Sequence, residues 1–363
     1  MKVGILGGGQ LGRMLALAGL PLGLRFVVLD PAANAPVGQL AKHVLADYDD
    51  DAALAELARS DVCTYEFESV PEAAARAIQS TTPVHPTPEA LRIAQDRLNE
   101  KLCFRELGIP TPAFEAVDSE HELRAAIAKM GLPAVLKTRR HGYDGKGQFL
   151  LRETGDIASA WLELGGVPLI LEGFVRFERE LSVLSVRGLD GATAFYPLVE
   201  NHHEQGMLRF SRTPVPALAP EQQKRAESYA VRLLDHMGYV GVLALELFEA
   251  GGQLLANEMA PRVHNSGHLT IEGARTSQFE NHLRAILGLP LGDTSVPEPV
   301  AMLNLVGGLP RREDMLAVPD AHLHFYAKQP RPGRKVGHVT VRAPDAATLD
   351  ERVARLEAII ASD

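Results

Sequence analysis

The stretch His141-Gly142-Tyr143-Asp144-Gly145-Lys146-Gly147-Gln148 follows one apolar run, residues 132–137, and leads into another at 149–151. This pattern predicts a strand that ends in Lys137, a glycine-rich loop and a second strand. Glycines free the backbone to turn its N–H groups toward an anion, and Lys137 and Lys146 add positive charge nearby. The stretch therefore favours a loop that covers the phosphates of a nucleotide. A plain hairpin loop with an Asp-Gly turn is the alternative.

Composition limits the classes of protein to be considered. The chain has 363 residues, of which 46% are hydrophobic and 23% charged. This length suits two or three domains, and the composition is that of an ordinary globular protein. The formal net charge of −9 argues against non-specific binding to nucleic acid or to an anionic membrane. We therefore expect small-molecule partners, with no nucleic acid and no membrane.

The cysteines and the N-terminus indicate the compartment. Cys63 and Cys103 are the only cysteines, and they lie too far apart for a short metal-binding spacing, so we expect two buried thiols in a reducing environment. No apolar run approaches the length of a membrane span. Residues 1–6 enter a strand directly, without a signal-peptide pattern. A cytoplasmic protein is the expectation.

The first 30 residues predict a parallel βαβ unit. A strand at 2–6 leads into Gly7-Gly8-Gly9-Gln10-Leu11-Gly12, which opens a helix, and a second strand at 25–29 ends in Asp30. This G-x-G-x-x-G turn and the spacing of the acid are typical of dinucleotide-binding folds, so the segment alone predicts an NAD-dependent oxidoreductase. A phosphate monoester also suits a helix N-terminus, so that alternative stays open.

The βα alternation continues and then breaks. A strand at 61–65 ends beside Glu66 and Glu68, which are expected to contact the ribose or amine of a substrate or to lie in solvent. Pro83-Val84-His85-Pro86-Thr87-Pro88 marks a domain boundary. A single helix is predicted from about 89 to 107. Its Arg97 and Lys101 share one face, which by default is a solvated basic edge.

Carboxylates interrupt two apolar strands further along the chain. Glu180 either holds ribose hydroxyls or faces solvent. A hairpin with its turn near Gly252 places Glu246 and Glu258 opposite one another on one face. Carboxylates among such apolar neighbours require a cation, which favours a magnesium site over a charged sheet face in water.

Two further segments carry groups suited to anions. Arg262 and His264 follow the hairpin in an irregular segment, where zinc binding by His264 and His268 is a less favoured alternative. The most basic segment of the chain contains Lys328, Arg331, Arg334 and Lys335. It indicates a nearby phosphate group, or a solvated charged loop.

The order of these motifs resembles the ATP-grasp family over essentially the whole chain, and within it the ATP-dependent carboxylases of purine biosynthesis. The motifs that carry the resemblance are Gly9-Gln10-Leu11-Gly12-Arg13-Met14, Tyr65-Glu66-Phe67-Glu68, Gln95-Asp96-Arg97, Gly142-Tyr143-Asp144-Gly145-Lys146-Gly147-Gln148, Phe177-Glu178-Arg179-Glu180, Asn257-Glu258-Met259-Ala260-Pro261-Arg262 and His264-Asn265-Ser266-Gly267-His268. The C-terminal Arg331-Pro332-Gly333-Arg334-Lys335 resembles the same family.

The resemblance implies an α/β protein, α+β overall, with the ATP-grasp fold. Its parts would be an N-terminal Rossmann-like parallel-sheet domain at 1–95, an ATP-grasp domain at 96–292 with a small lid at about 112–175, and a small C-terminal domain at 293–363. The implied reaction is ATP- and bicarbonate-dependent carboxylation of the exocyclic amine of 5-aminoimidazole ribonucleotide, through carboxyphosphate. ATP and Mg²⁺ would be the cofactors and a homodimer the assembly. A formate-dependent glycinamide ribonucleotide transformylase-like ligase is the alternative, and an oxidoreductase a weaker one.

The resemblance also implies residue roles. The residues that would contact ATP are Arg97, Lys137, Gly142, Gly145, Lys146, Gly147, Gln148, Glu172, Val175, Glu180, His203 and Asn257. Glu246 and Glu258 would bind the metal, with Asn257 beside them. Arg262, His264 and Lys328 would handle bicarbonate and carboxyphosphate, and Tyr143 and Asp144 the reacting amine. The ribonucleotide would be bound by Gln10, Leu11, Glu68, Arg331, Arg334 and Lys335.

Two positions depart from the family pattern. Ala327 stands in Tyr326-Ala327-Lys328 where the family usually has glycine, and Val263 stands where it has proline. Neither change removes a functional group. The question that they raise is whether the backbone near Lys328 follows the path usual in the family.

Overall fold

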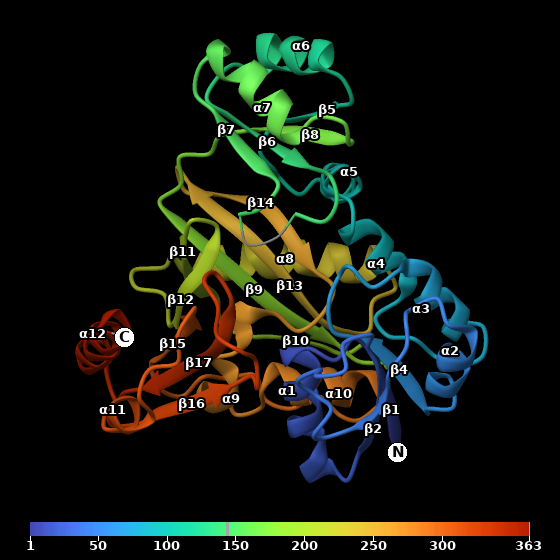
Figure 1. Cartoon of the computed structure of the whole chain (residues 1–363). Coiled ribbons are helices and arrows are strands. Elements are labelled where there is room, and N and C mark those ends of the chain that lie inside the picture. The colour runs from blue at the N-terminus through green and yellow to red at the C-terminus, as the bar shows by residue number, and fades with distance from the viewer. Residues whose placement is uncertain (143–144, 363) are drawn as a thin grey trace.

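Three β-sheets organise the protein in this computed structural model, which describes residues 1–142 and 145–362 (Figure 1). One sheet is N-terminal, one lies in a small lid, and the largest runs through the middle of the molecule. Both cysteines are buried and free, as predicted. Within the described part of the chain, no helix has the length and apolar character needed to cross a membrane.

The N-terminal sheet is parallel, with the strand order β3-β2-β1-β4. Its strands are β1 (Lys2–Leu6), β2 (Arg25–Leu29), β3 (Lys42–Val44) and β4 (Val62–Tyr65). The helices around it are α1 (Gln10–Gly19), η1 (Leu20–Leu22), α2 (Asp51–Leu57) and α3 (Glu72–Gln79). The predicted βαβ alternation is confirmed. The edge strand β3 was not predicted, because three half-exposed residues carry no apolar run.

The helix predicted from about 89 to 107 is wrong, because the chain forms two helices there. These are α4 (Pro88–Ala94) and α5 (Arg97–Glu106). Asp96 stands between them in an extended conformation and caps α5 by accepting hydrogen bonds from the N–H groups of Leu98 and Asn99. An aspartate at this position satisfies donors that a new helix start leaves open, so the break costs little.

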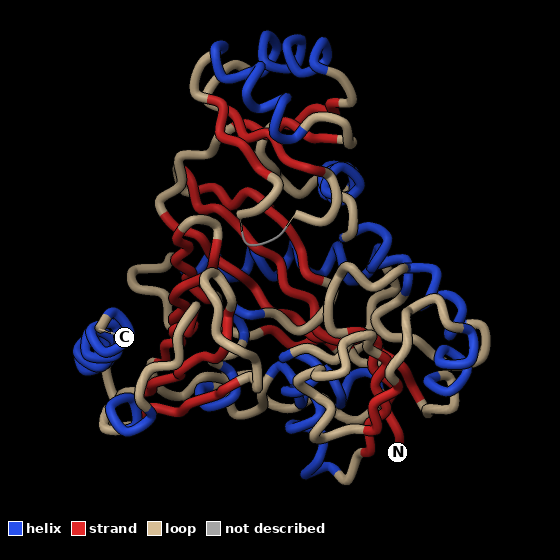
Figure 2. Tube along the Cα trace, in the orientation of Figure 1, coloured by secondary structure: helices blue, strands red, loops and turns tan. Residues whose placement is uncertain are grey.

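The lid is an antiparallel sheet, β5-β8-β6-β7, whose outer face is covered by α6 and α7 (Figure 2). Its elements are β5 (Phe114–Val117), α6 (Glu120–Met130), β6 (Ala134–Thr138), β7 (Gln148–Leu151), η2 (Thr154–Asp156), α7 (Ile157–Leu164) and β8 (Leu169–Gly173). Leu136 of β6 is buried against these helices, whereas Val135 and Lys137 line a cavity on the opposite face. This alternation aims Lys137 at the rest of the molecule.

The central sheet has the order β14-β13-β9-β11-β12-β15-β17-β16, with β10 paired to β9. Its first strands are β9 (Arg179–Arg187), β10 (Thr193–Phe195), β11 (Val199–Glu204), β12 (Met207–Thr213), β13 (Gly241–Ala250) and β14 (Gln253–Ala260). Helices α8 (Pro220–His236) and α10 (Gln278–Ile286) cover opposite faces. Val183 packs in the core that contains α8, and Leu184 packs in the core that contains α10.

The C-terminal segment extends the same sheet, because β12 pairs with β15. Its elements are η3 (Asn265–Gly267), α9 (Thr270–Gly273), β15 (Val300–Val306), α11 (Arg312–Leu316), β16 (Ala321–Phe325), β17 (Lys335–Arg342) and α12 (Ala346–Ala361). Loops from this segment reach back to the N-terminal sheet, where a second cavity forms.

Candidate active site

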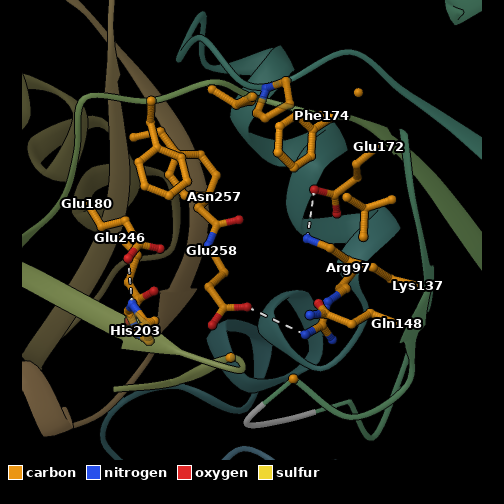
Figure 3. Close-up of a pocket in the computed structure, with 18 residues that line it drawn as sticks. Arg97, Lys137, Gln148, Glu172, Phe174, Glu180, His203, Glu246, Asn257 and Glu258 are labelled. Carbon is orange, nitrogen blue, oxygen red and sulfur yellow. Dashed lines mark hydrogen bonds and ion pairs between the residues drawn. The ribbon is translucent and has the colours of Figure 1, made fainter. Parts of the chain in front are cut away.

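A cavity of about 240 Å³ lies between the lid and the central sheet (Figure 3). The predicted residues that line it are Arg97, Lys137, Gly145, Gln148, Glu172, Val175, Glu180, His203, Glu246, Asn257 and Glu258. Among described residues predicted to contact ATP, Gly142, Lys146 and Gly147 belong to the adjoining loop and do not line the cavity. Positions from both ends of a long stretch of sequence, 97–258, thus meet in one place.

One wall of the cavity is basic and is built from β6, β8 and α5. The Lys137 Nζ lies 3.0 Å from Oε2 of Glu172, and the Lys101 Nζ lies 3.5 Å from the same oxygen. Burial opposes the charged form of Glu172, but the two lysines outweigh it and lower the pKa of the carboxyl to about 2. Glu172 is therefore an anion that holds both cations in place.

Lys101 is only 1% exposed, so its prediction as part of a solvated edge is wrong. Its Nζ donates to the carbonyl oxygens of Asn257 and Ala256, at 2.6 and 3.3 Å. Its neighbour Glu100 accepts the Met259 N–H at 2.6 Å. This pair clamps the backbone of β14 on both sides of Glu258.

Sequence reasoning missed Glu100 and Lys101 because charged residues on a helix are usually exposed. A signal did exist. Glu100, Cys103 and Phe104 recur at the spacing of one helical face, and all three are buried in α5. An apolar face that includes a carboxylate indicates a buried partner, and the partner here is the backbone of β14.

The opposite wall is acidic and is built on the hairpin of β13 and β14. Glu246 and Glu258 are direct cross-strand partners, which confirms the predicted register. Burial raises the pKa of Glu246 to about 7, and the charge of Glu258 adds to the shift. Arg97 Nη2 lies 3.5 Å from Glu258 Oε2. Two neighbouring carboxylates, Glu246 largely buried and Glu258 partly exposed, fit a divalent cation.

No group of three or more His, Cys, Asp or Glu side chains within residues 1–142 and 145–362 is arranged to hold a metal ion. The less favoured zinc hypothesis for His264 and His268 is wrong. The His268 side chain is 1% exposed and contacts Gln278, whereas the His264 ring lies 3.2 Å from Glu246. The two imidazoles therefore serve different neighbours.

Glu180 and His203 form a pair on the same face as the acidic wall. The His203 Nδ1 lies 2.9 Å from Glu180 Oε2. Burial lowers the pKa of His203, but the hydrogen bond to Glu180 and the charges of Glu180, Glu246 and Glu258 together outweigh it, so the net shift of this pKa is upward. Nearby, the rings of Phe177 and Phe248 stack with centroids 4.8 Å apart and an 8° interplanar angle. These rings, which sequence reasoning did not single out, give the cavity an apolar end.

Two described residues of the glycine-rich loop, Gly142 and Gly145, make contacts beside the cavity. Arg97 donates to the Gly142 carbonyl oxygen at 3.4 Å. Gly145 has φ = 76°, and a Cβ there would come within 2.5 Å of the Gln205 carbonyl oxygen in the turn between β11 and β12. Glycine is therefore required for this close approach. Tyr143 and Asp144, predicted for the reacting amine, lie outside the described residues.

One ion pair connects the segment after β14 to the N-terminal domain, and a histidine contact joins the same segment to Glu246 of the acidic wall. Arg262 Nη2 lies 2.5 Å from Glu68 Oε1, and His264 Nε2 lies 3.2 Å from Glu246 Oε1. Glu68 follows β4, and Arg262 follows β14. The predicted anion-handling residues Arg262 and His264 thus stand between the first cavity and the strand end of the parallel sheet.

The second cavity lies at that strand end and is also about 240 Å³. Its lining includes Gly9, Phe67, Lys328 and Arg334. Lys328, predicted for bicarbonate, lies here and donates to the side chain of Gln10. Among the described residues predicted to bind the ribonucleotide, Arg334 lines this cavity, whereas Gln10, Leu11, Glu68, Arg331 and Lys335 do not.

Glu66 is not a solvated strand terminus, and it lines the second cavity. It is 7% exposed and accepts the N–H groups of Gly9, Leu11 and Gly12 at 2.7, 3.1 and 3.0 Å. These are the donors with which a dinucleotide fold binds a pyrophosphate. A protein carboxylate already fills that position, which argues against the NAD hypothesis.

Ala327 resolves the backbone path near Lys328. It has φ = 56°, in the left-handed region that favours glycine. The alanine of this chain therefore follows the path that a glycine would take, at a cost in strain of about 1 kcal/mol. Lys328 still reaches the second cavity.

Two family models identify the class of enzyme to which this fold and site belong. The ATP-grasp domain model matches residues 102–279, and the ribonucleotide synthetase preATP-grasp domain model matches residues 1–95. The chain is an ATP-grasp enzyme, as the loop and the paired carboxylates indicate. A third model, the phosphoribosylaminoimidazole carboxylase C-terminal domain, matches residues 300–352.

Individual relatives narrow the class. N5-carboxyaminoimidazole ribonucleotide synthase of Pseudomonas aeruginosa is 55% identical over 361 residues, covering 99% of both chains. The crystal structure of the synthetase from Thermus thermophilus is 54% identical, covers 98% of both chains and has a TM-score of 0.95. The Aspergillus clavatus synthase in complex with ADP and 5-aminoimidazole ribonucleotide is 33% identical, covers 100% of this chain and 99% of its own, and has a TM-score of 0.93. This chain belongs to the N5-carboxyaminoimidazole ribonucleotide synthase family.

Proposed function

We infer that the chain carboxylates the exocyclic amine of 5-aminoimidazole ribonucleotide with ATP and bicarbonate. The observation that carries this inference is the pair of cavities. One is lined by lysine, arginine and acidic groups suited to ATP, and the other by Lys328 and Arg334, suited to a phosphate monoester. The ion pair of Arg262 with Glu68 stands between the elements that build them.

The reaction needs positioned charge more than a covalent nucleophile. Transfer of the γ-phosphoryl group to bicarbonate gives carboxyphosphate and ADP. The amine then attacks the carbonyl carbon, the C–N bond forms, the C–O bond to phosphate breaks, and the amine gives up a proton. Carboxyphosphate is short-lived in water, so a closing loop that excludes solvent is a functional requirement.

Residue roles follow from which groups face each step. Arg97 and Lys137 neutralise phosphate charge under the loop, and the Glu180 side chain meets the ribose. Arg262 and His264 hold bicarbonate and carboxyphosphate between the cavities. We assign Tyr143 and Asp144 to the amine, and we move Lys328 to the ribonucleotide side because it lines the second cavity.

Magnesium is the metal that we assign to Glu246 and Glu258, with Asn257 beside them. The upward shift of the pKa of Glu246 supports the assignment, since a cation removes the repulsion that causes part of it. Bound there, Mg²⁺ would neutralise developing charge on the transferred phosphoryl group. Phosphate oxygens and water would complete its coordination.

The domain division at 1–95, 96–292 and 293–363, the homodimer and the cytoplasmic location also stay proposals. The separate parallel sheet of the N-terminal part supports the boundary near 95. The central sheet runs across the boundary at 292/293, because β12 pairs with β15. Sedimentation of the purified chain tests the dimer directly.

The decisive test measures ADP release from the purified enzyme with Mg²⁺-ATP. Bicarbonate or formate is supplied together with either 5-aminoimidazole ribonucleotide or glycinamide ribonucleotide, in all four combinations. We expect release only with bicarbonate and 5-aminoimidazole ribonucleotide together, and loss of release in Glu258→Gln. Lys129→Met is a matched control, because Lys129 is 70% exposed on the lid and far from the lining residues. Release that depends on formate and glycinamide ribonucleotide would overturn the inference in favour of the transformylase.

A further inference from the structure

A row of polar side chains crosses the central sheet beneath the acidic wall. Glu246 of β13 lies opposite Ser182 of β9, and Asn201 of β11 lies opposite Ser211 of β12. Strand alternation puts all four side chains on one face, the face that carries Glu258 and His203. Burying hydroxyl and amide groups costs free energy unless they form hydrogen bonds, and small apolar side chains would fill the same space without that cost. The polar side chains at these positions therefore indicate a specific role.

These side chains form one continuous hydrogen-bonded chain that ends at His264. Ser211 donates to Asn201 Oδ1 at 2.8 Å, and Asn201 Nδ2 donates to Ser182 at 2.9 Å. Ser182 donates to Ser266 at 2.8 Å, and the Ser266 hydroxyl lies 2.9 Å from His264 Nδ1. The three serines are 0% exposed and Asn201 is 6% exposed, so water does not compete for these contacts.

A backbone contact fixes the direction of the chain at its end. The Ser266 N–H donates to His264 Nδ1 at 3.3 Å, and a backbone amide can only donate. His264 Nδ1 is therefore an acceptor, and the ring proton is on Nε2. The Ser266 hydroxyl then also donates to Nδ1, which agrees with the donor direction of every other link.

The backbone of His264 is held as firmly as its ring. Gln278, which is 0% exposed, accepts the His264 N–H at 2.9 Å and donates to the His264 carbonyl oxygen at 2.6 Å. The ring consequently has one position and one tautomer. Its Nε2–H points at Glu246 Oε1, 3.2 Å away, on the side of the first cavity.

We propose that Ser211, Asn201, Ser182 and Ser266 are positioning residues that lock His264 as a neutral hydrogen-bond donor toward the reacting anion. The proposal rests on the proposed function, because it takes the anion to be bicarbonate and then carboxyphosphate. Its chemical content is that His264 stabilises charge through Nε2–H. A ring whose Nδ1 is occupied by two donors and whose Nε2 carries a proton does not take a proton from the amine.

The first test reads the tautomer directly. Nitrogen-15 NMR of histidine-labelled enzyme distinguishes a protonated from an unprotonated ring nitrogen, and His264→Gln assigns the His264 signals by their loss. We expect the Nε2–H form at pH 8. An Nδ1–H form or an imidazolium in wild-type protein would overturn the proposal, whatever the enzyme is found to carboxylate.

Reversing one link tests whether the chain sets the tautomer. Asn201→Asp accepts from both Ser182 and Ser211, so Ser182 can no longer donate to Ser266. The Ser266 N–H remains as a donor to His264 Nδ1, so the expected result is a partial gain of the Nδ1–H form with about a tenfold loss of kcat. Ser182→Ala, a milder cut in the same chain, is expected to lower kcat by a smaller factor. The matched control is Ser185→Ala, because Ser185 is equally buried on β9 but donates to the Leu243 carbonyl oxygen.

Unchanged tautomer and kcat in both Asn201→Asp and Ser182→Ala, or equal losses in Ser185→Ala, would overturn the proposal. A comparison at His264 adds an activity readout. Glutamine offers an N–H donor near the position of Nε2 but no base, so His264→Gln should retain at least about ten times the kcat of His264→Ala, within the range expected for one such donor. Equal losses would favour a general base. Wild-type enzyme without bicarbonate-dependent turnover would refute the proposed function alone.

Discussion

Glu258→Gln is predicted to stabilise the metal-free protein while abolishing its ATP turnover. Glu246 has an ordinary pKa of 4.5 and a pKa of about 7 in the folded protein, because of burial first and the Glu258 charge second. Its folded-state pKa is raised, so the native state binds more protons than the unfolded state between these values. Stability from this group is therefore present at low pH and is lost as pH rises through about 7.

The size of the effect follows from the two pKa values. Their difference of about 2.5 corresponds to about 3 kcal/mol of stability lost above pH 7. Burial is the larger cause, and the charge of the partly exposed Glu258 is screened by solvent, so its repulsion is on the order of 1 kcal/mol. The ion pair that Glu258 makes with Arg97 is partly exposed and 3.5 Å long, and its loss costs at most ~0.5 kcal/mol. A net gain remains.

The assay is thermal unfolding without Mg²⁺ or nucleotide, at pH 8 and at pH 5.5. With an unfolding entropy of about 2.1 cal/mol/K per residue, the gain at pH 8 is about 1 °C for cooperative unfolding of the whole chain and more for one domain. At pH 5.5 Glu246 is protonated in wild type and the gain disappears. Glu249→Gln is the control, since Glu249 on the same hairpin pairs with Arg179 and its loss should destabilise at both pH values. A fall in melting temperature of Glu258→Gln at pH 8 would refute the reasoning.

Three further outcomes are expected. Lys101→Met should destabilise by about 3–5 kcal/mol, since it removes one of the two cations beside the buried Glu172 and the donor to the Asn257 and Ala256 carbonyl oxygens, whereas the exposed Lys129→Met should change stability by less than about 1 kcal/mol in the same denaturant titration; equal effects would contradict burial of the Lys101 charge. Ala327→Gly should raise stability by about 0.5–1 kcal/mol by releasing a left-handed alanine, and a lower melting temperature would contradict that strain. Arg334→Ala should raise KM for 5-aminoimidazole ribonucleotide by about tenfold and leave KM for ATP unchanged, and a rise confined to ATP would move Arg334 out of the ribonucleotide site.

Local pattern was enough to predict several features of the site. The turn near Gly252 and the two-residue period of strands set the register that makes Glu246 and Glu258 partners. The glycine spacing predicted the loop that now rests on the turn at Gln205. These predictions succeeded because each depends on residues close together in the sequence.

Other features depend on contacts between distant segments. Helix propensity is continuous from 89 to 107, and the break at Asp96 is stabilised by Arg139 from the lid, which makes two hydrogen bonds to its carboxylate. Lys101 reads as a surface residue until β14 supplies the carbonyl oxygens that receive it. Neither partner can be inferred from the helix itself.

The sequence by itself determined the N-terminal βαβ alternation, the glycine-rich loop, the paired carboxylates of the hairpin and the resemblance to ATP-grasp enzymes, because each of these depends on residues close together in the sequence. Only the tertiary structure decided that Glu66 fills the first helix N-terminus, that Lys328 belongs to the second cavity, and that four buried polar residues orient His264. A hydrogen bond or a buried charge is stable only with its partner, and the fold brings those partners together from far along the chain.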